Sequence, residues 1–325
     1  MRAWLCETLT GVAALQWKDL PTPEPQTGEV RVAVRAASLN FPDALIIEDK
    51  YQFKPPLPFV PGSEFSGVVE AVGPGVETAR PGDEVIVVGN TGGFATHAVA
   101  RAEGLIPKPA GFSFEEAAAF ALTYGTSHHA LLDRGRLCAG ETVLVLGAAG
   151  GVGTAAIQIA RAAGARVIAA VSSDEKAAFC LSLGADAVIC YSRENLRDRI
   201  KALTEGRGVD IVYDPVGGDL AEPAFRSLAW RGRFLVIGFA QGIIPSLPLN
   251  LALLKGADLV GVFWGDFVRR EPGRNRDAVA ELSQWYAKGT IKPALDRVLP
   301  MERLPEAYAR MAGRQVLGKL ILVNS

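Results

Sequence analysis

The sequence predicts an α/β protein in which a doubly wound parallel sheet is inserted into a split, mainly β domain. Three observations favour this class. Residues from about 25 to 110 read as short strands, residues from about 141 repeat a rhythm of strand, turn and helix, and this alternation stops beyond about residue 265. The length of 325 residues suits two hydrophobic cores of ordinary size.

The first segment has the two-residue period of β-structure. Residues 29–34 alternate polar and apolar side chains, which is typical of a strand with one buried face. Turn signals rich in Gly and Pro divide the strands at residues 61–62, 73–75 and 81–83. We expect a compact antiparallel or barrel-like unit that contains little helix.

The second segment predicts strands of nearly continuous apolar character. Such strands fit a parallel sheet covered on both faces, because neither side of a strand meets water. They span residues 142–146, 166–171, 187–189, 210–213 and 233–237. Later residues predict helices near 277–287 and 304–311 and a strand at 319–323, which we expect to return to the first domain. The predicted domains are residues 1–121 with 264–325, and residues 122–263, with the catalytic cleft between them.

Composition argues against several classes of partner. The chain is 49% hydrophobic and 21% charged, and no apolar run approaches the roughly 18 residues of a membrane span. Its formal net charge of -1 gives no electrostatic reason to attract nucleic acid or an anionic membrane. The first residues reach an acidic side chain before any secretory apolar stretch, so we expect a cytoplasmic protein.

Cysteine and histidine show no metal-binding spacing. The four cysteines are scattered, and we expect them to be buried structural thiols: Cys6, Cys138, Cys180 and Cys190. The three histidines are expected to be structural or surface residues: His97, His128 and His129. Adjacent histidines on a helix point about 100 degrees apart and do not form the usual ligand pair.

A glycine-rich motif predicts a dinucleotide site. The segment Ala148-Ala149-Gly150-Gly151-Val152-Gly153 follows a predicted strand and opens a helix. Gly150 would let the backbone approach a pyrophosphate, Gly153 would allow close packing of helix on strand, and the helix N-terminus would direct its N–H groups at the phosphates. The alternative is a tight strand-to-helix turn without a ligand.

The end of the second strand of this sheet favours NADPH over NADH. A carboxylate there would bind the ribose 2′-hydroxyl, but this strand ends in Ser172 and Ser173, with Lys176 nearby, and these residues form a plausible 2′-phosphate site. The same residues also read as a helix cap with Glu175 closing a capping box. Asp174 and Glu175 would lower the local positive potential.

Together these segments resemble the medium-chain dehydrogenase/reductase superfamily, and within it the zinc-independent quinone oxidoreductases related to zeta-crystallin. The resemblance runs nearly end to end and is carried by residues 37–43, 61–69, 82–85, 122–126, 148–153, 213–218 and 318–320. It implies a GroES-like substrate domain, a Rossmann domain, a homodimer, and NADPH-dependent reduction of quinones or activated alkenes.

The resemblance also implies roles for particular residues. Four of them match positions around the nicotinamide and the substrate pocket: Asn40, Asp43, Tyr51 and Thr126. Three more match the adenosine 2′-phosphate end: Ser172, Lys176 and Tyr191. Taken singly, each has an ordinary interpretation, as a turn residue, a surface or packing aromatic, or a helix cap.

Two positions separate this chain from the zinc-dependent branch of the superfamily. That branch has Cys where this chain has Ser38 and His where it has Ser63, and neither hydroxyl is a good zinc ligand. The four-cysteine structural lobe of that branch is also missing, because residues 87–90 run almost directly into residues 93–97. We therefore expect no metal.

The sequence leaves three functions open. The first is hydride transfer from NADPH to a quinone, which needs no metal to polarise it. The second is reduction of an enone, enal or enoyl thioester with the same cofactor. The third is a crystallin-like nucleotide- or RNA-binding protein without turnover. For an enzyme we expect catalysis mainly by orientation, with the Tyr51 and Thr126 hydroxyls and the Asn40 amide stabilising oxyanion charge.

Overall fold

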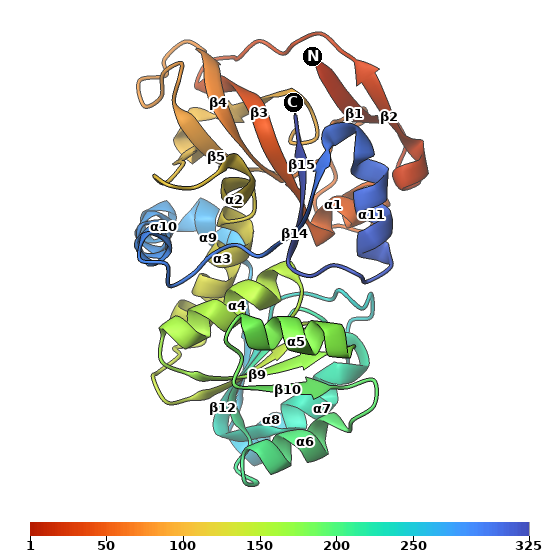
Figure 1. The fold of residues 1–325 in the computed structure, drawn as a ribbon, viewed down its shortest axis with the longest axis vertical. Helices are drawn as coiled ribbons and strands as arrows, with labels where there is room; N and C mark the ends of the chain where they lie inside the picture. The colour runs from red at the N-terminus through yellow and green to blue at the C-terminus, as the bar shows by residue number, and fades with distance from the viewer. Residues whose placement is uncertain (325) are drawn as a thin grey trace. The chain divides into compact units, whose positions relative to one another are not determined.

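The structure is a computed structural model and describes residues 1–324. The chain divides into two compact units, Met1–Leu122 with Pro293–Ser325, and Thr123–Lys292 (Figure 1). Ser325, the last residue of the predicted first domain, lies outside the described residues. Each unit is described by itself below.

Unit 1 is built on a mainly antiparallel sheet. Within residues 1–324, its seven strands follow the order β14-β15-β3-β4-β5-β7, with β6 also paired to β3, and β1 and β2 form a separate hairpin. The elements are β1 Arg2–Cys6, β2 Leu15–Asp19, β3 Glu29–Leu39, α1 Phe41–Ile46, β4 Glu64–Val72, β5 Glu84–Val88, β6 His97–Arg101, β7 Ile106–Pro107, α2 Phe114–Ala118, β14 Leu295–Pro300, α11 Leu304–Ala312 and β15 Lys319–Val323. This arrangement confirms the predicted β-rich class.

The long strand β3 organises unit 1. Its alternating side chains bury Val30, Val32 and Val34 in the core, as the two-residue period predicts. The terminal strand β15 pairs antiparallel with the end of β3, with Leu320 opposite Leu39. The predicted return of the last strand to the first domain is therefore confirmed.

Unit 2 contains a parallel sheet with strand order β10-β9-β8-β11-β12-β13. The order runs outward from β8 in both directions, which is the doubly wound arrangement predicted from the apolar strands. The strands are β8 Thr142–Leu146, β9 Arg166–Val171, β10 Ala187–Cys190, β11 Val209–Asp214, β12 Leu228–Val236 and β13 Asp258–Gly261. The intervening helices are α4 Gly151–Ala162, α5 Asp174–Ser182, α6 Leu196–Leu203, α7 Ala221–Arg226 and α8 Asn250–Lys255.

Two further helices, α9 Trp264–Arg270 and α10 Pro272–Ala287, also belong to unit 2. They contact α3 (Ala121–His128) and the following π-helical turn His129–Arg134. His128 lies 2.9 Å from Glu281, and the His129 ring stacks on Phe267 with ring centroids 4.0 Å apart. These contacts explain why residues 264–287 group with unit 2, whereas the sequence places them with the first domain. The predicted division into two domains stays a prediction.

The burial of the cysteines and the search for a membrane-spanning helix remain to be compared with the structure. Cys138 is exposed, because it lies in the turn before β8, so only Cys6, Cys180 and Cys190 are buried as predicted. Among residues 1–324, none of the helices combines the length and apolar character needed to cross a bilayer.

Candidate functional site

The turn after β8 brings backbone unusually close to backbone. The Gly150 amide donates to the Gly147 carbonyl at 3.0 Å, and the Thr154 amide donates to the Gly150 carbonyl at 2.8 Å. The amides of residues 151–153 therefore precede the first hydrogen bond within α4. A Cβ at Gly153 would lie 2.5 Å from the Gly147 oxygen, so glycine is needed for this approach. Such a helix start suits phosphate groups, because its amides and dipole favour negative charge.

A chain of hydrogen bonds anchors the first turn of α4. Ser127 Oγ donates to the Val152 carbonyl at 2.9 Å and lies 2.9 Å from the Tyr213 hydroxyl. Because the serine has one hydroxyl hydrogen and the carbonyl can only accept, Tyr213 must donate to Ser127. These groups join α3, α4 and the end of β11. The predicted residue Ala149 is buried in the turn between β8 and α4.

The loop after β11 packs on the same turn. Asp214 Oδ1 accepts hydrogen bonds from the Val216 and Gly217 amides, each at 2.8 Å. Burial raises the pKa of Asp214, and these two bonds oppose the rise. A Cβ at Gly147 would lie 2.8 Å from Val216 Cγ2, so this loop and the glycine-rich turn are fixed against each other.

The residues predicted for the 2′-phosphate end lie together. Lys176 Nζ donates to Ser172 Oγ at 3.3 Å. The Tyr191 amide donates to the Val171 carbonyl at 3.0 Å, which places Tyr191 beside the end of β9. Ser173 Oγ accepts from the Lys176 amide at 3.3 Å, so Ser173 is the N-cap of α5. The alternative capping box closed by Glu175 is wrong, because Lys176 occupies the third position of this helix.

Arg193 changes the electrostatics of this end of the sheet. Its guanidinium donates to Asp174 Oδ2 at 2.6 Å and lies 2.5 Å from Asp174 Oδ1. The hydrogen bond and the charge of Asp174 raise the pKa of Arg193. The negative charge of Asp174, which we expected to oppose a 2′-phosphate, is therefore paired with a cation.

In unit 1, Asn40 and Asp43 both belong to the start of α1. Asn40 is the N-cap residue, and its backbone N–H donates to Asp43 Oδ2 at 2.8 Å. The Asn40 side-chain nitrogen donates to Ser38 Oγ at 3.0 Å and has longer contacts of 3.3 and 3.4 Å with the Ser38 carbonyl and Glu64 Oε2. The two residues therefore have a structural role in addition to the one that the resemblance implies.

Asp43 is almost fully buried, and its burial raises the pKa of the carboxyl group to about 6. A hydrogen bond from the Asn40 backbone amide, the nearby Ser63 and the positive charge of Lys319 oppose this rise. Asp43 Oδ1 and Ser63 Oγ are buried without a well-formed hydrogen bond in the described structure, although the Ser63 hydroxyl is close enough to favour the charged carboxylate.

Tyr51 and Thr126 belong to different units. Tyr51 is half-buried against the core of unit 1, where burial and the charge of Asp43 raise the pKa of its hydroxyl. Thr126 is half-buried in α3, next to Ser127, in unit 2. Its other neighbour Gly125 touches Trp264, since a Cβ at Gly125 would lie 2.6 Å from the indole ring.

Sequence reasoning missed several residues that organise these sites. Glu64 and Lys319 are charged yet buried, and Ser127, Tyr213 and Arg193 complete the bonds described above. The sequence did contain a signal for Glu64 and Lys319, because each is a charged residue at the start of a largely apolar strand, Glu64–Val72 and Lys319–Val323. The other three depend on contacts between distant segments.

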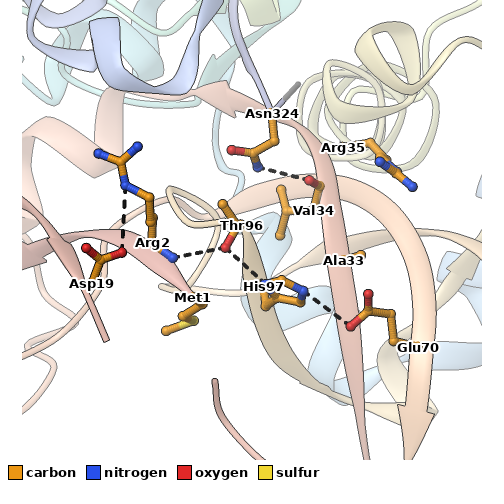
Figure 2. A pocket seen from close by; sticks show the side chains of 10 residues that line it. All are labelled: Met1, Arg2, Asp19, Ala33, Val34, Arg35, Glu70, Thr96, His97 and Asn324. Atoms are coloured by element: carbon orange, nitrogen blue, oxygen red, sulfur yellow. Dashed lines mark hydrogen bonds and ion pairs between the residues drawn. The ribbon is translucent and has the colours of Figure 1, made fainter. Parts of the chain in front are cut away.

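A separate pocket of about 430 Å³ in unit 1 contains none of the predicted site residues (Figure 2). His97 lies there, with Nδ1 3.0 Å from Thr96 Oγ1 and Nε2 3.3 Å from Glu70. Asn324 closes one side by donating to the Val34 and Ala95 carbonyls, each at 2.9 Å. These fixed contacts agree with the predicted structural role of His97.

A doubly wound sheet with a glycine-rich first turn, joined to a split β-rich unit, is the architecture of a two-domain dinucleotide-binding oxidoreductase. Residues 26–110 match the family described as "Alcohol dehydrogenase GroES-like domain", and residues 151–285 match "Zinc-binding dehydrogenase". The rat "Quinone oxidoreductase-like protein 2" is 39% identical over 323 residues, which cover 99% of this chain and 91% of the relative.

Solved structures agree with this assignment. The Escherichia coli quinone oxidoreductase complexed with NADPH superposes with a TM-score of 0.94 at 29% identity and full coverage of both chains. The Thermus thermophilus quinone oxidoreductase, described with its NADPH complex, gives 0.86 at 35% identity, again with full coverage. The chain belongs to the quinone oxidoreductase-like proteins of the medium-chain dehydrogenase/reductase superfamily.

The name of one matching family raises the question of zinc, and the residues at the expected position do not fit it. The Ser38 hydroxyl donates to Glu64 Oε2 at 2.7 Å, and the Lys319 ammonium lies 3.5 Å from the same oxygen. Zinc needs thiolate, imidazole or carboxylate ligands, and a neighbouring ammonium opposes a second cation. Among the described residues, no group of three or more His, Cys, Asp or Glu side chains is placed to hold a metal ion.

Proposed function

We propose that this protein is an NADPH:quinone oxidoreductase that works without zinc. The observation that carries the proposal is the start of α4, where the glycine-rich turn leaves the amides of residues 151–153 ahead of the first helical bond. It is supported by the NADPH complexes of the Escherichia coli and Thermus thermophilus relatives. The preference for NADPH rests on Ser172, Lys176 and Tyr191, which meet at the end of β9.

Bound NADPH would supply a hydride from C4 of its nicotinamide, and a quinone accepts it to give a hydroquinone anion. The role of the protein is then to orient the acceptor and to stabilise the negative oxygen. We assign these tasks to the Tyr51 and Thr126 hydroxyls and to the second hydrogen of the Asn40 side-chain amide, which has only long contacts. Water can protonate the hydroquinone anion, so no strong acid is required.

The alternative acceptor is an enone, enal or enoyl thioester. Hydride addition to the β-carbon leaves an enolate, which depends more on a positioned proton donor than a hydroquinone anion does. The Tyr51 phenol is protonated at neutral pH and can donate a proton to the enolate, although burial and the Asp43 charge raise the pKa of its hydroxyl and make it a weaker acid. This observation keeps enone reduction as the second candidate.

The deciding experiment compares acceptors with the purified protein. We expect rapid oxidation of NADPH with p-benzoquinone, slower oxidation with 2-cyclohexenone, and no dependence on added zinc or on chelators. Absence of turnover with both acceptors, combined with tight NADPH binding, would favour the non-catalytic, crystallin-like alternative. Stoichiometric zinc lost together with activity would refute the metal-free mechanism.

The variant Tyr51→Phe separates the two acceptor classes. We predict that it slows quinone reduction by less than about tenfold and slows enone reduction more, because only the enolate needs the phenolic proton. Steady-state rates with both acceptors test this, and Tyr286→Phe on α10 is a control for loss of a phenolic hydroxyl. Loss of all quinone turnover with NADPH binding intact would make Tyr51 an essential acid.

We also propose a homodimer and a cytoplasmic location. The dimer is supported by an apolar surface around the edge strand β13, defined by Trp230, Leu249, Leu253, Leu254, Leu259 and Phe263. The location rests only on the sequence at the N-terminus and stays a prediction.

A further inference from the structure

Lys319 is a buried cation that the proposed hydride transfer does not use. The residue is 5% exposed and opens β15. Burial lowers the pKa of its ammonium group, and the carboxylates of Glu64 and Asp43 oppose this change. A lysine is almost never buried in this way unless its charge is paired.

The backbone holds Lys319 in place before its side chain makes any contact. Gly318 has a φ of 94 degrees, and a Cβ at this position would overlap the Ala294 carbonyl, so only glycine fits. The Lys319 amide donates to that same carbonyl at 2.9 Å. The pairing of Leu320 with Leu39 then sets the lysine beside the end of β3.

The ammonium group of Lys319 contacts two buried polar residues, Asn40 and Glu64. Lys319 Nζ donates to Asn40 Oδ1 at 2.5 Å and lies 3.5 Å from Glu64 Oε2 and from the Leu39 carbonyl. Glu64 Oε2 accepts from Ser38 Oγ at 2.7 Å, and Glu64 Oε1 accepts from the Leu122 amide at 2.8 Å. Both carboxylate oxygens are therefore held by unit 1 itself.

This arrangement decides which way the Asn40 amide points. An ammonium can only donate, so the side-chain oxygen of Asn40 must face Lys319 and the nitrogen must face Ser38 and Glu64. Rotation of the amide by half a turn would set two donors against the ammonium and an oxygen against the carboxylate. One amide hydrogen binds Ser38 Oγ at 3.0 Å, and the second has only the longer contacts.

We propose that Lys319 is a positioning residue for acceptor reduction and acts through Asn40. By binding the amide oxygen, it fixes the nitrogen on the side of Ser38 and Glu64, so that the group that the amide can offer to the negative oxygen of the reduced acceptor is a hydrogen with only long contacts rather than a lone pair. Its charge also opposes the negative charge of the buried Glu64, whose Oε2 lies near the Asn40 nitrogen. The inference rests on the proposed function for its kinetic consequence, but not for the orientation of the amide.

The test uses Lys319→Met, which keeps most of the side-chain volume and removes the charge. Lys108→Met is the matched control, because Lys108 is another well-buried lysine of unit 1 that pairs with a glutamate, Glu84, at 3.0 Å. If Lys319→Met does not fold, the pair Lys319→Met with Glu64→Gln removes both charges together.

The first measurement does not depend on activity. Hydrogen exchange of the Asn40 side-chain amide is followed by NMR in protein labelled with ¹⁵N-asparagine, and the resonance is assigned by its loss in Asn40→Ala. We expect exchange to rise by at least about tenfold in Lys319→Met, as loss of one hydrogen bond to a charged group implies, and to stay unchanged in Lys108→Met. Unchanged exchange in both variants would overturn the proposal.

The second measurement is kinetic. We expect kcat with p-benzoquinone to fall by about tenfold or more in Lys319→Met while KM for NADPH changes by less than about twofold. In an Asn40→Ala background, Lys319→Met should cause no further loss, because the two residues act as one unit. A full additional loss there, or faster exchange without any kinetic effect in the wild-type background, would overturn the positioning role. A wild-type protein that is inactive with every acceptor would instead refute the proposed function. The hydrogen-exchange measurement would then decide the orientation of the Asn40 amide by itself.

Discussion

At the scale of single residues, the buried carboxyl of Asp43 gives a pH-dependent stability. Its pKa is raised to about 6 in the folded protein, whereas an unfolded aspartate titrates near 3.9. The folded state thus binds the proton more tightly, and the stability that this proton contributes is present below about pH 4 and lost as the pH rises through 6. A shift of about two units corresponds to about 3 kcal/mol.

The substitution Asp43→Asn should remove this dependence. We predict that the free energy of unfolding of the variant, relative to wild type, rises by up to about 3 kcal/mol between pH 4 and pH 7. Urea unfolding at several pH values measures it. Asp19→Asn, at a carboxylate whose side chain is 90% exposed, should show no such trend. A parallel pH dependence of the wild type and Asp43→Asn would contradict the buried-acid interpretation.

Lys176 gives the second residue-scale prediction. A charge-assisted contact with a 2′-phosphate is worth about 1.5 to 3 kcal/mol, so Lys176→Ala should raise KM for NADPH by about tenfold or more and leave KM for NADH nearly unchanged. Steady-state kinetics with both cofactors test this. Lys201→Ala, at an exposed lysine of α6, is the control. Equal effects on both cofactors would assign Lys176 to the capped helix surface instead.

At the scale of elements, the hydrogen-bond chain from Tyr213 through Ser127 to Val152 joins β11, α3 and α4. Tyr213→Phe removes one donor and leaves the Ser127 bond to Val152 in place. Ser127→Ala leaves both the Tyr213 hydroxyl and the Val152 carbonyl without this partner. We therefore predict that Ser127→Ala lowers the free energy of unfolding by about 1 to 3 kcal/mol, and Tyr213→Phe by less.

Urea unfolding of the whole protein measures these losses, and KM for NADPH reports whether the start of α4 is disturbed. Ser182→Ala serves as the control, because this exposed serine at the end of α5 bonds the Phe179 carbonyl of its own helix. An equal or larger loss in Tyr213→Phe would mean that the deduced direction of donation is wrong.

At the scale of the whole molecule, the edge strand β13 of the six-stranded sheet leads us to expect an association between two copies of the chain. In the described residues β13 pairs only with β12, and the apolar surface around it includes Leu259 and Leu253, which are 51% and 78% exposed. Exposed apolar edge strands associate or aggregate unless covered. A second copy, related by a two-fold axis, would cover this edge with its own.

We predict a dimer in solution that Leu253→Glu weakens or dissociates, since a charge would then be buried in the interface. Light scattering at micromolar concentration gives the mass. Leu181→Glu, on α5 and 48% exposed, introduces the same charge at an apolar site away from β13 and should leave the dimer intact. A monomeric wild type would contradict the assignment of this surface.

The sequence alone predicted the architecture of both parts of the chain, because periodicity is a local property. Strands β8 and β9 have the predicted bounds, and the glycine-rich turn stands where the motif placed it, since apolar runs and glycine spacing depend on neighbours in the chain. The family also followed from the sequence, because its motifs extend over nearly the whole chain.

The tertiary structure decided which polar groups meet. No local pattern pairs Lys319 with Asn40, which are separated by 279 positions, or neutralises Asp174 with Arg193. It also grouped residues 264–287 with unit 2, through contacts of α9 and α10 with α3 and the π-helical turn. Burial and hydrogen bonding between distant segments depend on the folded path of the chain, so the orientation of the Asn40 amide and the raised pKa of Asp43 could be found only there.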